Sequence, residues 1–128
     1  MRAALRWAVV VLTVLHGLIH LLGAAEGLGW AQVSAVRHPI STALGTGWLG
    51  AGVLVVLSGV LLATGARRWW IVGAVAVVAT QAVILTVWTG AALGTVANVV
   101  LLVAVVHGFA AEGPASLRTE YGSGSGPR

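Results

Sequence analysis

The residues best suited to chemistry in this chain are two histidines set four positions apart. His16 and His20 lie in the apolar stretch of residues 15–23, and this spacing places both imidazoles on one face of a helix. An imidazole can bind a metal, carry a proton near neutral pH or make a hydrogen bond. Ionisable side chains inside an apolar helix are costly to bury, so this face is the candidate functional site.

Two amide side chains fall at a similar depth when residues are counted along the apolar segments described below. We therefore predict one polar layer in the outer half of a helical bundle, formed by His16, His20, Gln81 and Asn98. Glu26 and His38 lie in the outer loop above this layer and are candidates for further contributors from that loop. His107 is left out, because it lies on the opposite face of the helix from Asn98 and near the other end of its segment.

Such a layer is compatible with several roles. In the simplest, the histidine and amide side chains hydrogen-bond one another and fix the register of the helices. In a second, His16 and His20 bind a transition metal such as zinc or copper, and Glu26 or His38 supplies a third ligand. A third is a haem or another cofactor, although two histidines on one helix face cannot be both axial ligands of one haem. Proton transfer and a small-molecule pocket are the remaining alternatives.

The elements that must position this site are unusually apolar. Hydrophobic residues make up 59% of the 128 residues and charged residues 8%, about a third of the charge of an ordinary soluble domain. This small number of polar residues could not cover the core of a small soluble fold. The composition therefore indicates an integral membrane protein. The chain has no cysteine, which excludes disulfides and thiolate metal sites.

Nucleic-acid binding and the common enzyme motifs find no support in the sequence. The net charge of +4 comes from seven scattered arginines, which form no basic groove. No phosphate-binding loop, GxSxG motif or dinucleotide-binding glycine pattern stands in a suitable context. We therefore expect no nucleic-acid partner, and the sequence favours a role other than catalysis.

Four apolar runs account for most of the chain, at about residues 7–25, 43–64, 69–89 and 91–111. A helix of about 20 residues crosses the hydrocarbon core of a bilayer. The runs predict an all-α, polytopic membrane protein, with a four-transmembrane-helix bundle in residues 1–112. Residues 113–128 are rich in Gly, Ser and Pro, and we expect a flexible cytoplasmic tail there.

The arginines predict how the bundle is oriented. Six of the seven lie before the first run, between the second and third, or after the fourth, and only Arg37 lies in the long connection on the other side. The positive-inside rule then places both termini in the cytoplasm. The arginine-only basic residues and the abundance of Ala, Val and Gly favour a bacterial inner (cytoplasmic) membrane. Residues 1–25 also resemble a signal peptide, but two histidines within its apolar part argue against that.

Small residues predict how the helices pack. Gly45, Gly52 and Gly59 recur every seven residues in the second run. Small residues at this spacing form the contact seam of a left-handed bundle in lipid, where helix backbones approach closely.

The stretch His-Gly-Leu-Ile-His-Leu, residues 16–21, resembles the first helix of small four-helix bacterial membrane proteins of unassigned activity. The resemblance covers one span. It implies a four-span bundle and brings no activity or site residue with it.

These observations predict a small membrane accessory or binding subunit that acts through lipid or a larger membrane complex. The partners would be the lipid bilayer, further copies of the chain or a larger membrane complex. The alternative is a metal- or cofactor-binding membrane protein that uses the His/Gln/Asn layer.

Overall fold

A computed structural model describes the backbone of residues 3–34 and 39–122, and side chains as far as residue 113. The described residues form the helices α1 (Ala3–Gly27), α2 (Thr42–Thr64), α3 (Trp69–Thr86), α4 (Trp88–Ala91) and α5 (Gly94–Gly122), and no strand. Within this part of the chain, four helices are long and apolar enough to cross a membrane, namely α1, α2, α3 and the first 20 residues of α5. The expected all-helical class with four apolar spans is confirmed.

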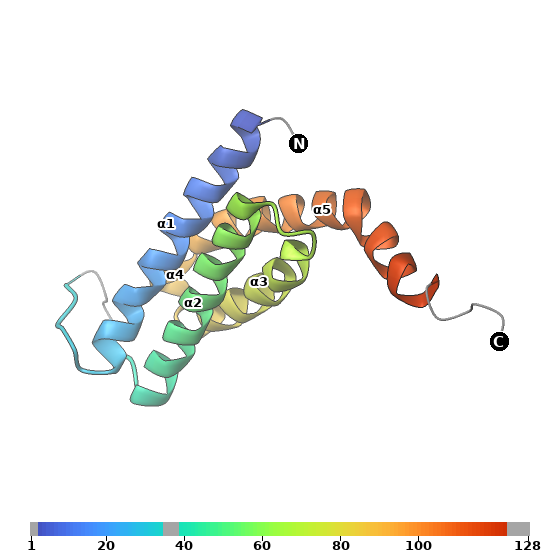
Figure 1. Cartoon of the computed structure of the whole chain (residues 1–128). Coiled ribbons are helices and arrows are strands. Elements are labelled where there is room, and N and C mark those ends of the chain that lie inside the picture. The colour runs from blue at the N-terminus through green and yellow to red at the C-terminus, as the bar shows by residue number, and fades with distance from the viewer. Residues whose placement is uncertain (1–2, 35–38, 123–128) are drawn as a thin grey trace.

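The helices follow one another around the bundle (Figure 1). α1 packs on α2 over the most extensive interface, α2 on α3, and α3 on α5, whereas α1 and α5 touch less. Ser41 caps the start of α2, and Gly65 ends it with a positive φ of 75° that favours glycine. Arg6 Nη2 donates to the carbonyl of Ala63 (2.5 Å) near this end of α2, so the start of α1 and the Arg67–Arg68 turn lie at the same end of the bundle.

Close backbone contact explains why α1 and α2 pack so extensively. A Cβ added to Gly27 would lie 2.6 Å from Gly45 Cα, and one added to Gly52 would lie 3.0 Å from the carbonyl oxygen of Gly17. Both distances are too short for a side chain without movement of the backbone. The predicted glycine seam of the second span is therefore confirmed, with Gly59 packed against Val14 further along it.

Apolar side chains also cover the outside of the bundle. Val78 is 71% exposed and Leu93 is 87% exposed, and many other leucines and valines share this position. Such a surface suits a lipid environment, where the helices satisfy their own backbone hydrogen bonds. A separate apolar core near the Arg6 end joins four helices, through residues such as Val10, Leu62, Trp69 and Leu101.

The helix boundaries differ from the sequence prediction at three places. α1 is longer than expected at both ends, and α3 stops at Thr86 rather than at residue 89. Val87 then leaves helical geometry (φ −132°, ψ 40°), and the short α4 forms the turn into α5. A flexible tail was expected from residue 113, but α5 continues as a helix through Gly122, bends, and extends beyond the other helices (Figure 1).

Candidate functional site

The amide of Asn98 is the centre of a buried hydrogen-bond network between α1, α3 and α5. Its Oδ1 accepts from the Thr80 hydroxyl (2.8 Å) and from His16 Nε2 (3.1 Å). Its Nδ2 donates to Gln81 Oε1 (3.0 Å). Asn98 is 2% exposed, so these bonds satisfy an amide that would otherwise be costly to bury. The three bonds tie the beginning of α5 to α1 and α3.

The network continues one step further along α3 and α5. Gln81 Nε2 donates to Thr95 Oγ1 (3.2 Å), one turn before Asn98 on α5. Gly94 lies beside it and leaves room for Ile84 and His16, because a Cβ there would lie 2.8 Å from Ile84 Cδ1. The start of α5 can therefore approach α1 and α3 closely.

His20 lies next to this network and makes different contacts. Its Nδ1 donates to the backbone carbonyl of His16 (3.1 Å), while Nε2 is buried without a hydrogen-bond partner among the described residues. The ring lies between two aromatic neighbours, with ring centroids 4.6 Å from His16 and 4.9 Å from Trp48. Gly23 makes room for the Trp48 indole, since a Cβ there would lie 2.5 Å from it.

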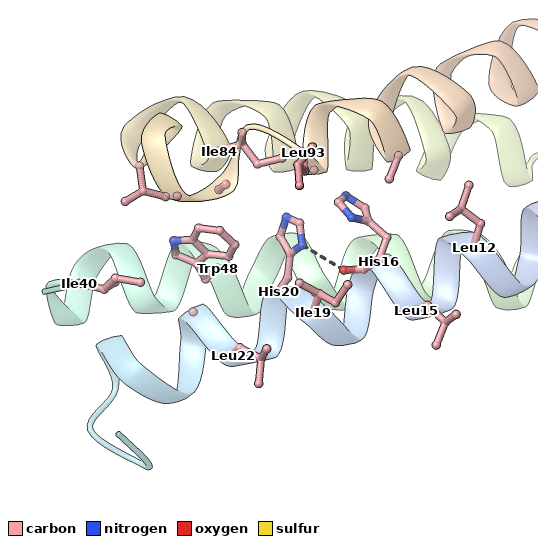
Figure 2. Close-up of a pocket in the computed structure, with 16 residues that line it drawn as sticks. Leu12, Leu15, His16, Ile19, His20, Leu22, Ile40, Trp48, Ile84 and Leu93 are labelled. Atoms are coloured by element: carbon pink, nitrogen blue, oxygen red, sulfur yellow. Dashed lines mark hydrogen bonds between the residues drawn. The ribbon is translucent and has the colours of Figure 1, made fainter. Parts of the chain in front are cut away.

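Both histidines line an apolar pocket of about 490 Å³ between α1, α2 and the α3–α4–α5 turn. In Figure 2 the rings of His16, His20 and Trp48 extend from α1 and α2 toward Ile84 and Leu93 on the opposite side. Leu15, Ile19 and Leu93 line the pocket and are also exposed on the outside of the bundle. The pocket therefore opens sideways, onto the apolar flank of the molecule.

The structure brings most of the predicted site residues together. His16, Gln81 and Asn98 join in one network, and His20 contacts it through His16. Glu26 instead accepts from the backbone amide of Val33 (2.6 Å) and so holds the outer connection. His38 lies outside the described residues, as do residues 35–37.

Three further site residues were missed from the sequence. Thr80 and Thr95 belong to the network, and Trp48 forms one wall of the pocket. The sequence does place Thr80 seven residues after Gly73, a spacing that marks an inward stripe. Trp48 could have been found from Gly45 and Gly52, because it lies between two glycines of the α1–α2 seam.

The imidazole nitrogens that the hydrogen bonds leave over are His20 Nε2 and His16 Nδ1, and the indole Nε1 of Trp48 is also buried without a partner among the described residues. Within the described residues, no group of three or more His, Cys, Asp and Glu side chains could hold a metal ion. A metal on these two rings would need a ligand from outside the described residues. A haem carries negative propionates, and none of the described residues that line the pocket has a charged side chain that could pair with them.

Comparisons with protein families, curated proteins and solved structures found no match to this chain.

Proposed function

We propose that this protein is a small membrane binding subunit that takes a lipid-soluble molecule from the bilayer into the pocket beside His16 and His20. The observation that carries the proposal is the pocket itself, with apolar walls, an opening on the apolar flank and a buried imidazole inside. Pockets that bind small molecules are mostly apolar, with a few polar groups that fix orientation. A sideways opening suits a ligand that arrives through lipid rather than through water.

We further propose a placement in a bacterial cytoplasmic membrane, with both termini in the cytoplasm. Arg6 and the Arg67–Arg68 turn lie at one end of the bundle, and positive charge collects on the cytoplasmic side. His20 is seven residues from the other end of α1, about 10 Å along the helix axis. The pocket would then lie in the outer half of the membrane.

The Asn98 network supports this function by holding the pocket walls. It joins α1 to α3 and α5, and α1 and α5 otherwise touch less than the other neighbouring long helices do. A preformed site binds more tightly, because the ligand does not have to order the protein around it. A larger membrane complex or a second copy of the chain would receive or deliver the ligand through the apolar flank.

Fluorescence quenching of Trp48 tests ligand entry. The protein in phosphatidylcholine nanodiscs is titrated with 1-bromo-3-decylbenzene, whose bromine quenches a nearby indole. We expect saturable quenching that is lost in Trp48→Phe and kept in Trp88→Phe, since Trp88 is half exposed and lies outside the pocket. Quenching that never saturates, or that persists in Trp48→Phe, would contradict the proposal.

A metal or cofactor site is the second candidate, favoured by the two ring nitrogens that the hydrogen bonds leave over. In this case His16 and His20 would supply two ligands, and the remainder would come from outside the described residues. Metal analysis and an absorption spectrum of the detergent-purified protein test it, beside the double variant His16→Ala/His20→Ala. A stoichiometric metal or a haem absorption band, absent in the variant, would favour this candidate over the apolar ligand.

A further inference from the structure

His20 carries a polar atom that the fold leaves without a partner. The side chain is 1% exposed, and its Nε2 is buried without a hydrogen bond among the described residues. An unpaired polar atom in an apolar environment is destabilising, and most buried polar atoms have a partner. A ligand in the pocket that His20 lines is the natural candidate for that partner.

The hydrogen bond on the other side of the ring decides what Nε2 can do. A carbonyl oxygen can only accept, so Nδ1 must carry the proton that it donates to His16 O. In a neutral imidazole the other nitrogen then holds a lone pair. Nε2 is therefore an acceptor, and its partner has to bring a hydrogen-bond donor.

The walls of the pocket decide which donors fit. The walls are mostly aliphatic side chains, and the described lining residues include no arginine, aspartate or glutamate. A carboxylate or phosphate head would find no cation, and its oxygens would face the lone pair of Nε2. An ammonium head would find no carboxylate. A neutral hydroxyl group on an apolar body meets both requirements.

The ring is also held in place before a ligand arrives. His16 lies edge-on to it, Trp48 packs against it, and the Nδ1 bond fixes its rotation. Figure 2 shows the ring extending from α1 into the space below Ile84 and Leu93. Such an acceptor selects for ligands that can donate, because a ligand without a donor leaves Nε2 buried and unpaired.

We propose that His20 Nε2 accepts a hydrogen bond from the hydroxyl group of a lipid-soluble alcohol or phenol, and so determines the specificity of the pocket. This inference rests on the proposed function, because it assigns the ligand class of the same pocket. His20 acts here as a binding residue, with Nε2 as the contact atom. The apolar part of the ligand lies along the leucine and isoleucine side chains of the pocket and its opening.

A matched pair of probes tests the inference. 3-Bromo-5-decylphenol and its methyl ether differ in the donor hydrogen and one methyl group, and both report on Trp48 by quenching in nanodiscs. We expect the wild-type protein to bind the phenol about five- to tenfold more tightly than the ether, the effect of one buried hydrogen bond. The saturated pair, 3-bromo-5-decylcyclohexanol and its methyl ether, shows whether an aliphatic hydroxyl is accepted as well as an aromatic one.

His20→Phe removes the acceptor and keeps a ring of similar size. We expect this variant to bind phenol and ether equally, while His107→Phe, an exposed histidine away from the pocket, keeps the preference. Equal affinity of the wild-type protein for the members of both pairs would overturn the inference and leave the proposed function standing. A preference that survives in His20→Phe would also overturn it. Absence of saturable quenching by any probe would instead contradict the proposed function.

Discussion

His20 donates its Nδ1 proton to the backbone carbonyl of His16, 3.1 Å away and one helical turn earlier. This bond uses one ring nitrogen within α1 and leaves the other, Nε2, buried without a hydrogen-bond partner among the described residues. His16 does the reverse, since its Nε2 donates to Asn98 on α5 and its Nδ1 is left over. Two histidines that look equivalent in the sequence therefore make different contacts. His16 bonds to another helix, whereas His20 bonds within α1 and lines the pocket.

The hydrogen bonds predict opposite tautomers for the two rings. His16 donates from Nε2 because Asn98 Oδ1 accepts, and His20 donates from Nδ1 because a carbonyl accepts. The chain has four histidines, and two-bond ¹H–¹⁵N correlation spectra of histidine-labelled protein should show opposite tautomers for His16 and His20, whose signals are assigned with His16→Phe and His20→Phe. The same tautomer on both rings would show that one of these hydrogen bonds does not form.

Replacing Asn98 by leucine should destabilise the bundle more than any other change in the polar network. The change removes three hydrogen bonds and leaves His16 Nε2 and Gln81 Oε1 without them. Such bonds contribute about 0.6 kcal/mol each in a membrane, so the free energy of unfolding should fall by about 2 kcal/mol. Unfolding by sodium dodecyl sulfate, followed by circular dichroism, measures it. Thr95→Val loses one peripheral hydrogen bond and should lower the free energy of unfolding by about 0.5 kcal/mol. Equal effects of the two variants would argue against a central role of Asn98.

Two glycines on opposite faces of α2 give a matched test of the helix seam. A Cβ at Gly45 would lie 2.8 Å from Gly27 Cα, whereas one at Gly50 would meet nothing within 4 Å. Gly45→Ala should therefore push α1 and α2 apart and lower the free energy of unfolding by about 1–3 kcal/mol. Gly50→Ala should be neutral or stabilising by up to about 1 kcal/mol, because alanine favours helix. The same detergent titration applies, and a stable Gly45→Ala protein would mean that the seam is looser than described.

Because the chain has no cysteine, single introduced cysteines can report the orientation of the protein in the membrane. Ser34 is exposed in the connection after α1, and Thr64 is exposed at the end of α2 beside the Arg67–Arg68 turn. With the termini in the cytoplasm, a membrane-impermeant maleimide should label Ser34→Cys in intact bacteria. Thr64→Cys should react only after the membrane is opened. The opposite pattern would invert the proposed topology and place the pocket in the cytoplasmic half.

The sequence was sufficient to predict the spanning helices, the glycine seam and part of the polar network, because these depend on the length of apolar runs and on residue spacing. A run of about 20 apolar residues has few alternatives to a spanning helix, and the seven-residue spacing of Gly45, Gly52 and Gly59 already marks the side that faces α1. Counting depth along the spans also brought Asn98 and Gln81 to the level of His16. These polar side chains lie in apolar surroundings, so they had few possible hydrogen-bond partners other than one another.

The remaining features, namely the two threonines of the network and the pocket, depend on three-dimensional geometry that residue spacing does not predict. Thr80 and Thr95 escaped notice because a threonine in a helix can satisfy its hydroxyl on its own backbone, as Thr80 also does with Ala76 O (2.8 Å). The pocket arises where α3 stops at Thr86 and the α4 turn replaces the helix that was expected to continue. No periodicity signals that break, since Val87 and Trp88 are as apolar as the residues before them.

The central claim is that a lipid-soluble molecule occupies the pocket, and native mass spectrometry tests it most directly. Protein released from nanodiscs that contain 3-bromo-5-decylphenol should carry one probe molecule per chain. Ala91→Phe should lose this adduct, because Ala91 lines the pocket and the larger ring would fill it. Ala82→Phe, an exposed position on α3 outside the pocket, should keep it. An adduct that is equally abundant in both variants, or missing from the wild-type protein, would contradict the claim.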